Sequence, residues 1–176
     1  MIKYILPIFF ITPVYGGSVY IDQVGDGNIF YIDQSSSGNS EAILLNKGDS
    51  NSLSILQQGS GDHLAFIGTP PLGKNYDNTY ITNTTASANS NNTLNILQSG
   101  AGNHTAAINL DPTTSNNNNT ATITQSGDAN KNFTLALSGS NIGATILQDS
   151  NTTPDSSSMS IQCYTGTCNG YSYIKH

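Results

Sequence analysis

The sequence predicts an all-β protein that folds as a β-solenoid of about five to six stacked strand-turn-strand rungs. Three observations support this fold class. A unit of 23 residues recurs along the chain, and each half of it has an alternating apolar pattern followed by a turn that contains glycine. The chain is also rich in Asn, Ser, Thr and Gly, which are weak helix formers, and it has no long run with apolar residues at a period of 3.6.

The first 16 residues are predicted to form a secretory signal peptide. Lys3 precedes an apolar stretch that ends at Ile11, and the small residue Gly16 suits a cleavage site. The apolar stretch is shorter than the roughly 20 residues that span a bilayer. A buried strand is the alternative interpretation. We therefore expect residues 17–176 to be secreted and to be located extracellularly or at the cell surface.

The repeated unit follows the pattern Q-x-G-x-x-N-x5-Q. Within Asn28–Gln34, alternate residues point one way, so that Phe30 and Ile32 would pack between two strands folded over one another. Stacking identical rungs would align the side-chain amides into ladders, in which each amide donates to one neighbour and accepts from another. The predicted ladder residues are Gln23, Asn28, Gln34, Asn46, Asn51, Gln57, Gln98, Asn103, Gln125, Asn130 and Gln148. The predicted turn glycines are Gly25, Gly48, Gly59, Gly100 and Gly127.

The longer form of the unit, S-x5-Q-x-G-x-x-N-x5-Q, resembles the curlin repeat, the building block of curli amyloid fibres on bacterial surfaces. Ser40–Gln57 matches it at every spacing, with Asn46 in place of the first glutamine, and Gly25–Gln34 is similar to a repeat of the minor, nucleating subunit. The resemblance covers most of residues 17–148. It implies a β-solenoid subunit that polymerises end to end with itself or a related curlin subunit, and that leaves through a dedicated pore with a chaperone.

This resemblance predicts a self-assembling structural protein, a fibre subunit or nucleator for extracellular matrix, adhesion and biofilm. The alternative is a capped, non-polymerising β-solenoid that acts as a surface-binding or adhesin module, or as a virion surface fibre protein. A disordered linker protein is the third interpretation.

The repeat is interrupted in several places. Residues 69–91, with Pro70 and Pro71, are predicted to be a non-repeat insertion, because proline cannot donate to a central ladder. Asn116–Asn119 are expected to form a bulged loop. The apolar residues of 131–137 lie one position out of phase, which predicts a rung that departs from the stack. Three further ladder positions are assigned by the spacing to Gly68, Asn109 and Ala136.

Residues 149–176 are predicted to cap the solenoid. An even number of cysteines in an exported chain predicts a disulfide between Cys163 and Cys168. A metal site built on C-x4-C and two free thiols are the alternatives. We expect the end of the stack to be covered by Tyr171, Tyr173 and Ile174.

Composition argues against several function classes. Charged residues make up 9% of the chain, with 11 acidic residues against 5 basic ones, all lysines. The chain therefore lacks a basic stripe for nucleic acid and offers few ionisable groups for catalysis. We predict no enzymatic activity, cofactor, metal or small-molecule substrate. His63, His104 and His176 are expected to be solvated on strand faces, and Asp22 and Asp33 to lie on opposite outer faces of one rung.

Overall fold

The computed structural model describes residues 9–11, 17–36, 38–74, 80–81, 83 and 85–176. The predicted signal peptide therefore lies outside the described residues, except for its short strand Phe9–Ile11. The described part of the chain contains strands and no helix, so none of it forms a helix that could cross a membrane. The predicted all-β class is confirmed.

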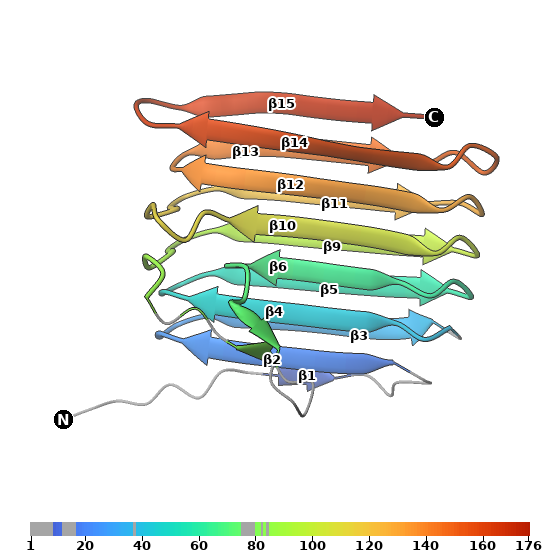
Figure 1. Cartoon of the computed structure of the whole chain (residues 1–176), viewed down its shortest axis with the longest axis horizontal. Coiled ribbons are helices and arrows are strands. Elements are labelled where there is room, and N and C mark those ends of the chain that lie inside the picture. Colours follow the sequence, from blue (N-terminus) through green and yellow to red (C-terminus); the bar gives the residue numbers. More distant parts are fainter. Residues whose placement is uncertain (1–8, 12–16, 37, 75–79, 82, 84) are drawn as a thin grey trace.

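Two parallel sheets run along the molecule (Figure 1). Sheet A contains, in spatial order, β1 (Phe9–Ile11), β3 (Ile29–Ser36), β5 (Ser52–Gly59), β9 (Thr93–Gly100), β11 (Thr120–Ser126), β13 (Ile142–Gln148) and β15 (Cys168–Lys175). Sheet B contains β2 (Ser18–Val24), β4 (Glu41–Lys47), β6 (Leu64–Gly68), β10 (His104–Leu110), β12 (Lys131–Gly139) and β14 (Asp155–Cys163).

Each rung consists of one strand of sheet B followed by one strand of sheet A. The six strands of sheet B thus define six rungs, which stack as a β-solenoid, as the repeat predicts. Every neighbouring pair within the two sheets is parallel, and the pairing is in register along nearly all of their length.

The core fills the space between the two sheets. In β3 the inward residues Phe30 and Ile32 are 2% and 4% exposed, whereas the outward residues Ile29 and Tyr31 are 63% and 41% exposed. The same alternation continues up the stack, so that the inward side chains of both sheets form one continuous apolar cluster. The strand faces predicted for Asn28–Gln34 are therefore confirmed.

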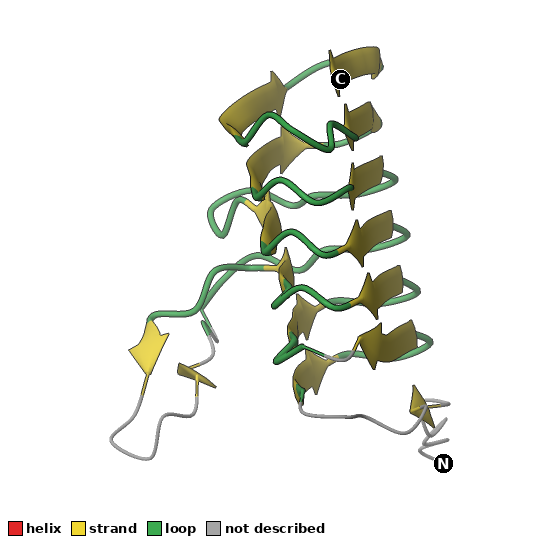
Figure 2. Cartoon of the chain, turned by 90° about the vertical axis from the view of Figure 1, so that its right-hand side faces the viewer, coloured by secondary structure: helices red, strands yellow, loops and turns green. Residues whose placement is uncertain are grey.

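The insertion leaves the stack between β6 and β9. It carries the antiparallel pair β7 (Gly73–Lys74) and β8 (Tyr80–Ile81), which lies on the outer side of sheet B, near β2 and β4 (Figures 1 and 2). Ile43 and Leu45 alternate with the core residues of β4 and yet are only 3% and 2% exposed. The insertion thus lies on the one sheet and leaves the outer side of sheet A uncovered by described residues (Figure 2).

The prediction that residues 131–137 depart from the stack is wrong. Phe133, Leu135 and Leu137 are at most 1% exposed and pair in register with Ala106, Ile108 and Leu110 of β10. The repeat spacing places the sheet B ladder positions one residue too early in β6, β10 and β12, in the row of Leu45 rather than the row of Asn46. The inward positions of this sheet hold Leu110 and Leu137, so Asn109 and Ala136 point outward and were wrongly assigned to the ladder. Gly68 is outward by the same register.

Candidate functional site

Five glutamines of sheet A form one continuous ladder through the core. Each Nε2 donates to the Oε1 of the next glutamine, at 2.8, 3.0, 3.0 and 2.8 Å in chain order. The members are Gln34, Gln57, Gln98, Gln125 and Gln148, all at most 2% exposed. Their sequence separations are 23, 41, 27 and 23 residues, so the register of the sheet aligns them even where the repeat is interrupted.

The same amides tie sheet A to the beginnings of sheet B strands. Gln34 Nε2 also donates to the backbone oxygens of Ser18 and Ser40, each at 3.2 Å. Gln57 Nε2 donates to the backbone oxygen of Glu41 at 3.1 Å. Because a buried amide that loses its partners costs about 1–3 kcal/mol, the ladder specifies the register of both sheets.

Asparagines just before the sheet A strands form a second ladder. Asn51 and Asn92 each donate from the backbone N and from Nδ2 to the Oδ1 of the asparagine one rung below, at 2.9–3.0 Å. The ladder continues to Asn119, whose backbone N donates to Asn92, and ends where Ile142 N donates to Asn119 Oδ1. It begins at Asn28, which with Asn51 was predicted from the repeat.

Four buried asparagines that form ladder bonds were not predicted from the repeat. Asn89 and Asn92 close the insertion, and Asn116 and Asn119 lie in the segment expected to bulge, but all four are at most 1% exposed. The bulged-loop prediction is therefore wrong. Asn116 Nδ2 donates to Asn89 Oδ1 at 2.9 Å. Both pairs share the spacing N-x-x-N. This spacing is a sequence signal for the ladder, but it is not part of the Q-x-G-x-x-N repeat.

The residue before each member of the second ladder, and before Ile142 in the rung above it, adopts the left-handed conformation. Positive φ values of 56–58° occur at Ser50, Asn91, Asn118 and Asn141. The equivalent residue of the first rung is Gly27, with φ 67°. Asparagine tolerates this conformation better than most residues, so the Asn-rich segments substitute for the glycine turns.

The remaining predicted amides occupy different positions. Asn103 and Asn130 are exposed in the other set of turns, where Asn103 N donates to Asn130 Oδ1 at 2.9 Å. Gln23 and Asn46 are register neighbours in sheet B, but each donates to a glycine carbonyl of its own turn. They are therefore turn-stabilising residues rather than members of a long ladder.

All five predicted turn glycines, Gly25, Gly48, Gly59, Gly100 and Gly127, have positive φ. The requirement is clearest at Gly100, where φ is 112° and a Cβ would lie 2.3 Å from the backbone oxygen of Gly127 in the next rung. A side chain there would push consecutive rungs apart.

Two histidines that we expected on solvated faces are buried instead. His63 and His104 are 1% and 0% exposed, and their rings stack 5.0 Å apart in consecutive rungs. Each Nε2 bonds to a backbone oxygen, of Gln58 at 2.9 Å and of Ser99 at 3.0 Å. Burial lowers the pKa of both imidazoles. Sequence separation hid this pair because only the stacking brings the two residues together.

The column of these histidines continues into Lys131, which is 1% exposed. Its Nζ donates to the backbone oxygens of Ala129, Ser150 and Thr153 at 3.1, 2.7 and 3.0 Å. Burial lowers the pKa of Lys131, against the attraction of nearby carboxylates. His176, by contrast, is exposed and pairs with an aspartate at 2.8 Å.

The C-terminal rung is closed by a polar cluster around Asp155. Its Oδ2 accepts hydrogen bonds from Gln148 Nε2 at 2.5 Å and Tyr173 OH at 2.8 Å, and its Oδ1 accepts one from Ser157. Burial raises the pKa of Asp155, but these hydrogen bonds and the Lys175 charge outweigh it and lower the pKa overall. The glutamine ladder thus ends on a carboxylate.

A disulfide joins Cys163 and Cys168 between β14 and β15. Of the three residues expected to cover this end, Tyr173 packs on Phe133 with ring centroids 5.0 Å apart. Ile174 is 58% exposed and pairs with the outward Leu147, so it lies on the outer face of sheet A rather than over the end.

The N-terminal rung has buried acceptors without donors. Gln34 Oε1 and Gln23 Oε1 are buried and find no hydrogen-bond partner among the described residues, and neither does the Ser40 hydroxyl at the start of the next rung. Gln34 Oε1 lies at the end of the ladder, where every other glutamine oxygen receives a bond from the rung below. β1 pairs with only Phe30–Ile32 of this rung.

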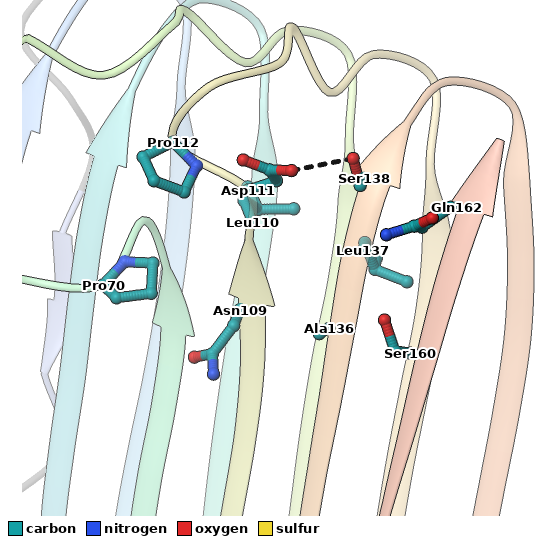
Figure 3. Close-up of a pocket in the computed structure, with 10 residues that line it drawn as sticks. All are labelled: Pro70, Asn109, Leu110, Asp111, Pro112, Ala136, Leu137, Ser138, Ser160 and Gln162. Carbon is teal, nitrogen blue, oxygen red and sulfur yellow. Dashed lines mark hydrogen bonds between the residues drawn. The ribbon is translucent and has the colours of Figure 1, made fainter. Parts of the chain in front are cut away.

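A hollow of about 240 Å³ lies on the outer side of sheet B (Figure 3). Pro70 and Pro112 form one of its sides, and Asp111 is its acidic lining residue. Asp111 accepts hydrogen bonds from Thr113 N and Oγ1 at 2.8 and 2.7 Å and from Ser138 Oγ at 2.8 Å. The bonds from Thr113 contribute most to lowering its pKa. This carboxylate therefore acts as an acceptor that stabilises the loop.

Comparison with protein-family models, with curated proteins and with solved structures finds no match to this chain.

Proposed function

We propose that this chain is a secreted structural protein of the curlin type, which polymerises end to end as a fibre subunit or nucleator. The observation that carries the proposal is the complementarity of the two ends of the glutamine ladder. At one end, Gln34 Oε1 is a buried acceptor without a donor among the described residues. At the other end, Lys175 is the register partner of Gln148 and so occupies the ladder position of the last rung.

A second copy placed one rung beyond β15 would bring the Lys175 ammonium opposite Gln34 Oε1. An ammonium has only donors, and an unpaired buried amide oxygen costs about 1–3 kcal/mol, so this joint would satisfy both groups. The outermost strands β14 and β15 pair on one side only within the described chain, which leaves an edge for strand addition.

The predicted signal peptide bears on this joint. β1 lies within it and pairs with Phe30–Ile32, the edge that an added copy would use. Removal of residues 1–16 on export would free that edge, so assembly would follow secretion. Head-to-tail addition is a heterologous contact that does not close, and it therefore builds a filament.

The experiment follows the mature chain 17–176 by thioflavin T fluorescence and electron microscopy. Growth of unbranched fibrils after a lag supports the proposal. Lys175→Glu, which sets an acceptor against Gln34, is expected to slow elongation at least tenfold, whereas Lys175→Gln, which extends the amide ladder, retains it. His176→Glu is the control for added negative charge. A wild-type chain that stays a β-rich monomer, or a Lys175→Glu variant that elongates normally, refutes the proposed joint.

The second candidate is a capped solenoid that binds a surface without polymerising. The Asp155 cluster and the disulfide favour it, because Gln148 already has an acceptor within the chain. A wild-type chain that stays a stable β-rich monomer in the fibril assay and co-sediments with cells or particles would support this function instead.

A further inference from the structure

The outer face of sheet A carries no charged side chain on its four central strands. The outward residues of β5, β9, β11 and β13 are Ser, Thr, Asn, Gln, Gly and Leu. Charges occur only towards the ends of the face, at Asp33 in the first rung and at Asp149 and His176 at the other end. In most proteins, charged residues on an exposed sheet protect it against association, and the central part of this face lacks them.

Two rows of side chains run along this face in the direction of the stack. The register places Leu56, Leu97, Thr124, Leu147 and Ile174 in one row. The neighbouring row is built of short polar side chains, Ser54, Asn95, Thr122, Thr145 and Ser172. The two rows begin in the first rung at Asp33 and Tyr31. Above that rung, the face consists of a mainly aliphatic row, interrupted by Thr124, beside a row of small residues, a relief that allows another sheet to approach closely.

The size of the face matches what a protein partner needs. Strands of about seven residues at ~3.3 Å each, in the five rungs from β5 to β15 at ~4.8 Å, give an area of about 550 Å². Two such faces would bury about 1,100 Å², just above the roughly 1,000 Å² that a specific protein interface needs. The insertion lies on sheet B, so no described residue competes for this face (Figure 2).

We propose that two copies of this chain pair laterally through the outer faces of their A sheets. A second copy fits because its rungs rise by the same step. The mainly aliphatic row of one copy would therefore meet a row with the same spacing along the whole contact. Because the four central strands carry no charge on this face, pairing them imposes no cost for desolvating charges. The inference deepens the proposed function by adding a side contact to the end contact, and it uses a different surface.

The test uses the mature chain with Lys175→Glu, which is expected to slow end-to-end growth at least tenfold, in sedimentation velocity over a concentration series. A dimer is the expected species. Adding Thr122→Lys, at the centre of the face, is expected to weaken dimerisation at least tenfold, because it buries a charge on each side of the contact. Thr134→Lys makes the same change at an outward position of sheet B and is expected to alter the dissociation constant less than twofold. Circular dichroism checks that both variants fold.

The outcomes separate the two joints. A Lys175→Glu chain that is monomeric throughout the series overturns the lateral contact and leaves end-to-end growth intact. A dimer that survives Thr122→Lys, or that is weakened equally by Thr134→Lys, also overturns it. A monomer that instead binds insoluble cellulose or chitin through this face would assign the face to a polysaccharide. The Lys175→Glu chain could form a dimer sensitive only to Thr122→Lys while the wild-type chain forms no fibrils. That pair of results supports the lateral contact and refutes the proposed function.

Discussion

Mild acid is expected to destabilise the solenoid through His63 and His104. Both imidazoles are buried, stacked on one another, and followed along their column by the Lys131 ammonium. Protonating them would put three positive charges in consecutive rungs, with Asp62 as a nearby opposing charge for His63. Because burial lowers the pKa of both groups below 6.5, the folded chain resists the protons that the unfolded chain binds.

The direction and size of the effect follow from this difference. Stability is fully present above pH 6.5, where both states leave the histidines neutral, and falls as the pH drops below that value. The unfolded imidazole is half protonated at pH 6.5, so a histidine that stays neutral in the fold removes at most about 1 kcal/mol of stability between pH 6.5 and pH 5.5, and the pair at most about 2 kcal/mol. Asp111 and Asp155 have pKa values lowered from 3.8, so their contribution is lost only in stronger acid.

The assay is urea unfolding of the Lys175→Glu chain at pH 7.5, 6.5, 5.5 and 5.0, monitored by circular dichroism. Replacing both histidines by glutamine, which keeps a donor at the Nε2 position, should flatten the dependence below pH 6.5. His176→Gln, which removes an exposed histidine outside the buried column, is the control variant. An unchanged slope in the double variant would refute the assignment, as would a stability of the Lys175→Glu parent chain that is flat from pH 7.5 to 5.0.

Three further predictions concern the ladders, the turns and the cap. Gln98→Leu leaves Gln125 Oε1 without its ladder donor and should lower the free energy of unfolding in urea by about 2–3 kcal/mol. Gln58→Leu, at an exposed neighbouring position, should lower it by less than about 0.5 kcal/mol. Equal losses would contradict the ladder. Gly100→Ala should cost more than about 2 kcal/mol, because its Cβ would meet the Gly127 oxygen at a φ of 112°, while Gly143→Ala meets only the movable Asn169 side chain and should be tolerated. Reduction of the Cys163–Cys168 bond opens a very short loop and should lower the free energy of unfolding by about 2 kcal/mol. Hydrogen exchange should become faster only in β14 and β15, and loss of protection throughout the stack would contradict a local role for the cap.

Residues at a regular spacing were the ones that the sequence could predict. The alternation of Phe30 and Ile32 with exposed residues predicted the strand faces, and the Q-x-G-x-x-N turns predicted which glutamines lie on one side of sheet A. These features repeat every rung, so a local pattern suffices to reveal them. The all-β class and the solenoid follow from the same pattern.

The order of stacking, in contrast, depended on the tertiary structure. Gln57 and Gln98 are ladder neighbours 41 residues apart in sequence, and Asn92 bonds to Asn51 across the same insertion. Strand pairing sets the register between adjacent rungs, and the length of the chain that loops out between them does not change it. The same holds for the stacked pair His63 and His104. A side chain's depth in a solenoid is set by which rung comes to lie above it, and that neighbour is chosen by hydrogen bonding between whole strands rather than by any residue nearby in the sequence.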